Sequence, residues 1–110
     1  MKHLVNITPQ AYVEARDTRL AKGLATFAHP TIPRAHSIMH IQSGKRIITT
    51  WFKSRAAARR ALQLIAAARL LDWSKSGDDV RAEMRQDDNY PRYRALCAEF
   101  CLGRDVANVY

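Results

Sequence analysis

The sequence predicts a small α+β domain in which a β-hairpin packs against about four helices. Its 110 residues are 47% hydrophobic, which is enough apolar material for one core. One segment rich in β-branched and aromatic residues flanks a glycine-containing turn, and several Ala- and Leu-rich segments with helix caps accompany it. Gly and Pro number only four each, which excludes a collagen-like or low-complexity chain. We therefore expect a single globular domain over residues 1–110.

The N-terminal quarter is predicted to hold a strand and then a helix. Residues 1–7 are a candidate third strand for the hairpin sheet. Thr8 followed by Pro9 has the residue types of a helix N-cap and first helical position. This predicts a helix from Pro9 to about Leu24, ended near Gly23.

A β-hairpin is predicted from about Ser37 to Phe52. The segments SIMHI and RIITTWF have the composition of strands, and QSGK between them has the composition of a turn. The preceding segment AHPTIPRA contains two prolines and is expected to form a loop.

Three further helices are predicted after the hairpin. Ser54 is a good N-cap for the strongest one, over residues 55–71, where Ala and Leu dominate. The segment KSGDD breaks that helix and precedes another, over about 79–85. The last helix is predicted over 91–103, with apolar side chains at the spacing of a buried stripe.

The helix over 55–71 is expected to pack against its surroundings through more than one face. At 100° per residue, Ala57, Ala61, Leu64 and Ala68 share one side, which we expect to be the core face. The second half of the helix is apolar nearly all round. It is therefore predicted to pack on two sides, against the C-terminal helices, another protein or a second copy of the chain in a homodimer.

Neither a secretory signal nor a membrane span is evident. The apolar N-terminal residues are interrupted by Asn6, and the longest low-polarity run, 62–71, is far shorter than the roughly 20 residues that cross a bilayer. Cys97 and Cys101 point the same way on one predicted helix, which favours reduced thiols over a disulfide. We expect a cytoplasmic protein with no membrane partner. Its Arg- and Ala-rich composition is common in bacterial and phage proteins.

Positive charge is concentrated in the middle of the chain. The formal net charge is +8, yet residues 18–71 hold ten Lys and Arg side chains and no Asp or Glu. Residues 72–110 hold six basic and eight acidic side chains. Such a central segment projects a positive field unless a carboxylate from elsewhere neutralises it. The two candidate counter-ions are the acidic C-terminal third and an external polyanion.

The densest basic cluster surrounds the start of the helix over 55–71. Cations there are unfavourable beside the positive end of the helix dipole, and a bound anion would reverse that effect. The hairpin turn adds two more cations, and Trp51 or Phe52 could stack on unpaired bases. The predicted phosphate contacts are Lys45, Arg46, Lys53, Arg55, Arg59 and Arg60.

Two functions of different classes follow from this charge. The first is a small module that binds nucleic acid, DNA or RNA, or a nucleoprotein complex. About five phosphate contacts would give a log-log salt slope near −4 to −5 on duplex DNA. The alternative is a phage- or plasmid-type accessory protein, of the anti-defence or anti-CRISPR kind, that inhibits a host nucleic-acid-processing complex by protein–protein contact.

A third hypothesis is a small metal-independent ribonuclease, with His36 or His40 as general base and Lys45 or Arg46 as phosphate clamp. No catalytic or nucleotide-binding motif requires it, so we expect no enzymatic activity. A zinc site is not expected, because His36 and His40 on one strand would stand about 13 Å apart. No cofactor is predicted.

Overall fold

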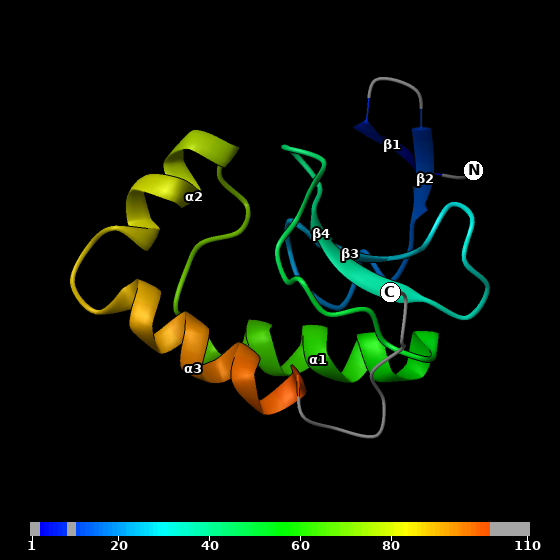
Figure 1. The fold of residues 1–110 in the computed structure, drawn as a ribbon. Helices are drawn as coiled ribbons and strands as arrows, with labels where there is room; N and C mark the ends of the chain where they lie inside the picture. Colours follow the sequence, from blue (N-terminus) through cyan, green and yellow to red (C-terminus); the bar gives the residue numbers. More distant parts are fainter. Residues whose placement is uncertain (1–2, 9–10, 102–110) are drawn as a thin grey trace.

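The computed structural model describes residues 3–8 and 11–101, and these form two antiparallel sheets and three helices (Figure 1). The two-stranded sheet contains β1 (His3–Thr8) and β2 (Ala11–Ala15). The three-stranded sheet has the order β3 (Leu24–Ala28), β4 (His36–His40) and β5 (Lys45–Arg46). The helices are α1 (Arg55–Ala68), α2 (Gly77–Met84) and α3 (Asn89–Cys101). The α+β class is confirmed, with three helices in this part of the chain rather than about four.

The two sheets are joined by backbone pairing just beyond their ends. Arg16, directly after β2, exchanges two hydrogen bonds with Thr26 of β3, at 2.8 and 2.9 Å. All five strands therefore follow one another as an antiparallel meander. The candidate strand over residues 1–7 is present as β1, but it pairs with β2 and not with the hairpin.

The helix predicted over residues 9–24 is wrong. β2, a turn and the start of β3 lie in its place, and residues 9–10 fall outside the described chain. Val13 and Ala15 are both buried, two residues apart on one face of a strand. Asp17 and Gly23 have φ of 58° and 88°, in the left-handed region that a helix interior does not adopt. These two residues bound the turn.

The predicted hairpin is confirmed in its first strand and turn, but its second strand is much shorter than expected. β5 ends at Arg46, and the Ile47 N–H still donates to the Ile38 carbonyl of β4 at 3.0 Å; the next backbone pairing with β4 comes where Phe52 and His36 exchange hydrogen bonds of 2.7 and 2.9 Å. Between these points the buried Ser37 hydroxyl donates to the carbonyl of Thr50 at 2.9 Å. The side chain thus replaces ladder bonds, and the chain between β5 and Phe52 bulges away from the sheet.

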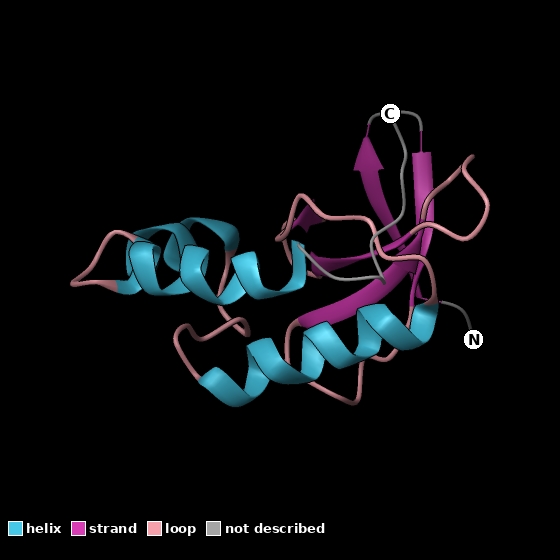
Figure 2. Ribbon diagram, turned by 60° about the horizontal axis from the view of Figure 1, so that its bottom comes forward, coloured by secondary structure: helices cyan, strands magenta, loops and turns pink. Residues whose placement is uncertain are grey.

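The central strands β3 and β4 are buried on both faces. Leu24 and Ile38, both 0% exposed, pack in one cluster with α1 and the later helices. Their neighbours Ala25 and Met39, also 0% exposed, belong to a second cluster with residues of β1 and β2. Figure 2 shows α1 lying along one side of the sheet. The strands that carry the β4–β5 turn are therefore held firmly from two sides.

The core face of α1 is rotated relative to the prediction. Ala57 and Ala61 are buried as expected, but Leu64 is 52% exposed, and the large buried residues are Leu62 and Ile65. Ala68, predicted to be buried, is exposed as well. Leu62 faces the cluster that contains Leu24 and Ile38, so contact with β3 and β4 sets the buried stripe. An average helical wheel does not show which of two adjacent apolar stripes the sheet will cover.

The last two helices begin slightly earlier than predicted. α2 starts at Gly77 because the Ser76 hydroxyl accepts a hydrogen bond from the Asp79 N–H at 3.2 Å. In α3, Tyr93 is buried, and Leu96 and Cys97 pack partly against the main core, as their spacing indicated. Within the described residues, no helix is long and apolar enough to cross a membrane.

Replacing Arg69 with glycine should stabilise the fold. Arg69 is the exposed C-cap of α1 and has φ of 51°, a conformation that costs an ordinary residue roughly 1–2 kcal/mol and glycine almost nothing. After the higher unfolded-state entropy of glycine is subtracted, we expect a net gain of about 0.5–1 kcal/mol, or a Tm higher by roughly 3–5 °C. Thermal unfolding followed by circular dichroism measures it. Arg69→Ala is the control, because it removes the same charge but keeps a Cβ, and a matching rise in that variant would contradict the backbone explanation.

Candidate nucleic-acid interface

The six predicted phosphate contacts are all exposed, but the structure divides them into two sets. One set lies at the β4–β5 turn, where Lys45 and Arg46 make up the short edge strand β5. The other set lies around the start of α1 and contains Lys53, Arg55, Arg59 and Arg60. Each set has its own surroundings.

At the turn, Arg46 lies over an aromatic side chain. Its guanidinium carbon is 4.5 Å from the ring centroid of Trp51, within the range of a cation–π contact. Trp51 also contacts the His29 ring, with centroids 4.6 Å apart, and the edge of Phe27 at 5.5 Å. Trp51 is half-buried, whereas Phe52 is 2% exposed and belongs to the core. Of the two aromatic residues considered for stacking, only Trp51 is partly exposed, and a base that stacks on its ring must share that ring with Arg46 and His29.

These residues border a shallow groove, which we call the Trp51 groove. It has a volume of about 530 Å³ and is lined by residues 44–49 together with Phe27 and Trp51. Both cations of β5 line it, together with apolar side chains that include Ile47 and Ile48. A groove with an aromatic wall and a cationic edge can accept a planar ring beside a phosphate.

At the start of α1, an internal carboxylate occupies the position predicted for an anion. Arg55 donates to both oxygens of Asp17, from Nη2 at 3.0 Å and Nε at 3.1 Å, and Arg59 Nε lies 3.2 Å from Oδ1. The buried Thr26 hydroxyl donates to Oδ2 of the same group at 2.5 Å. Ser54 caps the helix as predicted, accepting from the Ala57 N–H at 3.1 Å.

This carboxylate is largely withdrawn from water and well stabilised. The Asp17 side chain is only 6% exposed. Burial by itself raises the pKa of Asp17, but the hydrogen bonds from Arg55 and Thr26, with the charges of Arg55 and Arg59, outweigh burial and hold the pKa below its ordinary value. The hydrogen bond and charge of Asp17 raise the pKa of Arg55 in turn.

Comparison with known proteins supplies no relative for this arrangement. No family model, curated protein or solved structure matches the chain. The function is therefore inferred from the contacts of the side chains themselves.

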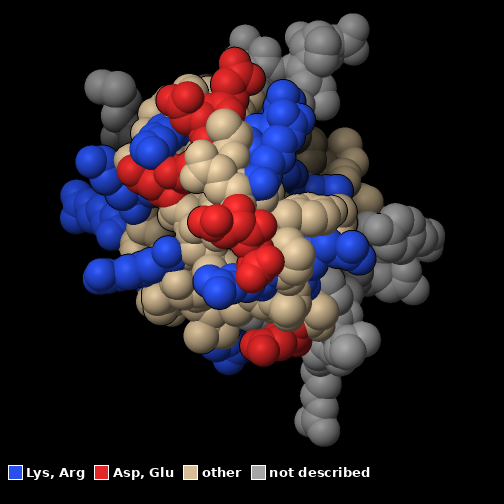
Figure 3. Space-filling view, turned by 90° about the vertical axis from the view of Figure 1, so that its left-hand side faces the viewer, with Lys and Arg blue, Asp and Glu red and all other residues tan. Residues whose placement is uncertain are grey.

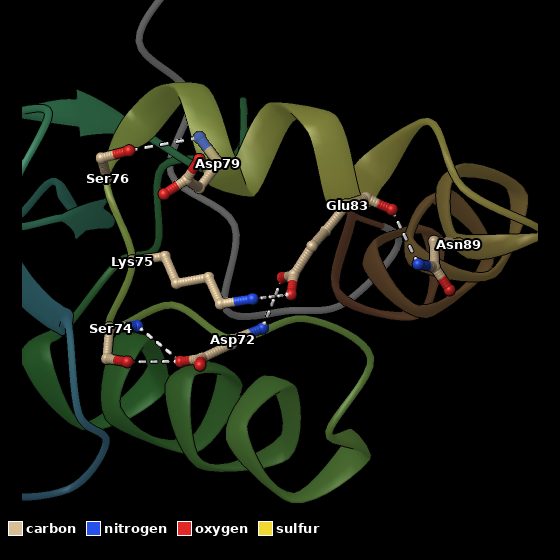
Figure 4. A network of polar contacts seen from close by, with 7 residues as sticks. All are labelled: Asp72, Ser74, Lys75, Ser76, Asp79, Glu83 and Asn89. Carbon is tan, nitrogen blue, oxygen red and sulfur yellow. Dashed lines mark hydrogen bonds and ion pairs between the residues drawn. The ribbon is translucent and has the colours of Figure 1, made fainter.

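Two acidic side chains of the C-terminal third, Glu83 and Asp78, make ion pairs with cations of the same third. Lys75 contacts Glu83 at 2.7 Å, and Glu83 also accepts from the Asp72 N–H at 3.0 Å (Figure 4). Asp78 lies 3.9 Å from Arg81 on α2. Figure 3 shows acidic and basic side chains interleaved on the end of the molecule that carries α2. The carboxylate that reaches Arg55 and Arg59 comes instead from the position just before the acid-free segment.

The two histidines of β4 have different surroundings. His40 is 3% exposed, and its Nε2 lies 2.9 Å from the Trp73 carbonyl and 2.8 Å from the Lys75 carbonyl, so it donates a shared hydrogen bond there. This contact ties the turn to the linker before α2. Burial, then the charges of Arg16 and Arg55, lowers the pKa of His36. In the described part of the chain, no three His, Cys, Asp or Glu side chains gather closely enough to hold a metal ion.

Sequence reasoning missed three participants. Asp17 was assigned to a helix, and His29 and Phe27 to a loop and an unassigned segment, whereas all three support predicted site residues. An aspartate tolerates positive φ better than most residues, and Asp17 stands directly before a long acid-free segment. These two features were the available signal for Asp17. The contacts of His29 and Phe27 with Trp51 depend on strand pairing and left no local signal.

Proposed function

We propose that this protein binds nucleic acid through the β4–β5 turn and the Trp51 groove. The observation that carries the proposal is the stacking of Arg46 on Trp51 at the edge of a groove that Lys45 also borders. Base stacking on an aromatic side chain contributes about 1–3 kcal/mol, and adjacent cations bind the phosphates. Because the groove offers a ring face and no array of polar groups aimed at base edges, the expected binding depends little on base sequence.

The arginines at the start of α1 form a secondary contact in this proposal. Asp17 already satisfies part of their charge, so a phosphate there must compete with a carboxylate. Lys45 and Arg46 are therefore the principal contacts, and we expect a salt slope shallower than about −4 on duplex DNA.

The test is a comparison of two double variants with equal charge loss. Lys45→Ala/Arg46→Ala should weaken binding of a labelled 20-nucleotide strand at least tenfold, measured by fluorescence anisotropy at fixed salt. The control is Arg85→Ala/Arg92→Ala, which removes one exposed charge at the C-cap of α2 and one from α3. It should change the affinity less than threefold.

Two outcomes would contradict the proposal. If both double variants weakened the affinity for the labelled strand equally, the binding would depend on the net charge of the protein alone. Absence of binding to single-stranded or duplex DNA and RNA would favour the alternative in which the basic surface contacts a protein.

A further inference from the structure

We infer that the bound nucleic acid is single-stranded and crosses β5, placing unpaired bases in hollows on both sides of that strand. This inference rests on the proposed function and specifies its substrate. It comes from a second hollow, between the β4–β5 turn and the helices α2 and α3, of about 240 Å³. Figure 1 shows the turn rising beside α2.

The second hollow has an aromatic floor. Trp73 and Tyr93 line it and are 7% and 8% exposed, with ring centroids 5.8 Å apart and planes inclined at 56°. Val80 and Met84 of α2 add an apolar wall. Such a volume is smaller than the roughly 300–1,000 Å³ of drug-sized sites and suits one ring system.

Cations stand at the mouth of this hollow. Lys45 and Arg46 line it as well as the Trp51 groove, so β5 separates the two hollows and borders both. Arg81 of α2 also lines this hollow, with its side chain 52% exposed. Its contact with the Asp78 carboxylate, at 3.9 Å, is at the long limit of an ion pair and leaves donors for a phosphate.

The walls of the second hollow are fixed before any ligand binds. The Tyr93 hydroxyl donates to the carbonyl of Ile47, directly after β5, which joins α3 to the edge strand. His40 joins the same turn to the carbonyls of Trp73 and Lys75. A preorganised site loses little conformational entropy on binding.

Two apolar hollows on either side of a dibasic strand match a chain of alternating bases and phosphates. Phosphates would lie over Lys45 and Arg46, and a base would enter each hollow. A duplex keeps its bases paired and stacked, so it can place phosphates on β5 but leaves both hollows unfilled. The complementary ligand is therefore single-stranded.

The two tryptophans allow each hollow to be observed separately. Trp51→Phe leaves Trp73, in the floor of the second hollow, as the sole tryptophan of a chain that contains two. Because Trp51 belongs to the proposed interface, this variant should bind more weakly than the parent, so both readouts are taken on the variant itself. Titration with a labelled eight-nucleotide oligothymidylate should quench Trp73 emission with the same midpoint as the change in anisotropy of that oligothymidylate. The Kd for the single strand should be at least tenfold lower than that for a blunt duplex of equal length.

A second pair of variants tests the contribution of Arg81, a cation that lines the second hollow. Arg81→Glu should weaken binding of the oligothymidylate at least tenfold. Arg85→Glu makes the same charge change at the C-cap of α2, at a residue that lines neither hollow, and should have an effect below threefold.

The outcomes separate this inference from the proposed function. Anisotropy changes without quenching of Trp73, or equal affinity for the duplex, would overturn the inference that a single strand fills both hollows. The proposed binding at the Trp51 groove would still stand. No anisotropy change with any nucleic acid would overturn both.

Discussion

Replacing Gly23 with alanine should destabilise the fold by about 3–5 kcal/mol, a loss large enough to leave little folded protein at 37 °C. Gly23 has φ of 88°, and a Cβ added there would lie 2.0 Å from the Trp73 carbonyl oxygen and 2.5 Å from its carbonyl carbon. Both atoms belong to the backbone, so no side-chain rotation relieves the clash. The carbonyl oxygen also accepts from His40, and its displacement disturbs that buried contact.

Urea unfolding followed by circular dichroism measures this loss. The matched control is Lys22→Ala, which changes the exposed neighbouring residue and should shift stability by less than about 0.5 kcal/mol. A Gly23→Ala protein within about 1 kcal/mol of the parent would show that the turn and the linker do not approach as closely as described.

Asp17→Asn should cost about 2 kcal/mol of stability at pH 7. Removing one member of a buried ion pair commonly costs 3–5 kcal/mol, and the effect is smaller here because Arg55 and Arg59 are 47% and 48% exposed. The amide keeps an oxygen for the Thr26 hydroxyl, so the loss reports mainly charge. Asp78→Asn, whose side chain is 95% exposed, is the control and should be nearly neutral.

The contribution of Asp17 should also depend on pH. Because the folded-state pKa of Asp17 lies below its ordinary value of 3.8, the stabilisation is fully present above that value and is lost as pH falls through the folded-state pKa. Urea unfolding of the parent and of Asp17→Asn should therefore give curves that differ at pH 7 and converge as pH falls below 3.8. A difference that stays constant down to low pH would contradict the assigned role of the carboxylate.

The Asp17→Asn variant should bind nucleic acid more tightly than the parent protein. Without the carboxylate, Arg55 and Arg59 become available to phosphates, and the log-log salt slope on duplex DNA should steepen by up to about 1.8, the value for two additional contacts. An unchanged slope would mean that these arginines do not face the bound strand, and would restrict the interface to β5.

The sequence predicted the elements that depend on local signals. Ser54 marks the start of α1, and the Gly-containing turn after β4 places Lys45 and Arg46 at the surface, as composition indicated. The secondary-structure predictions that were wrong share a cause. Val13, Leu20 and Leu24 fit a helical spacing, and only pairing with β1 and β4 decides that Val13 belongs to β2 and Leu24 to β3.

The division of the predicted phosphate contacts into two sets was likewise not predictable from the local sequence pattern. Asp17 and Arg55 are 38 positions apart, and nothing near either residue indicates the other. The charge profile predicted that residues 18–71 project a positive field, and the counter-ions it pointed to were the C-terminal third and an external ligand. The described structure supplies Asp17, because the turn after β2 brings it beside the first turn of α1.

The shortness of β5 has a consequence for self-association. An edge strand exposes unpaired backbone groups that can template pairing with another chain, and long apolar edges promote aggregation. Here the edge is two residues long and both are cationic, so a second copy approaching it would bring like charges together. Lys45 and Arg46 therefore disfavour edge-to-edge pairing at β5, independently of any ligand that they bind.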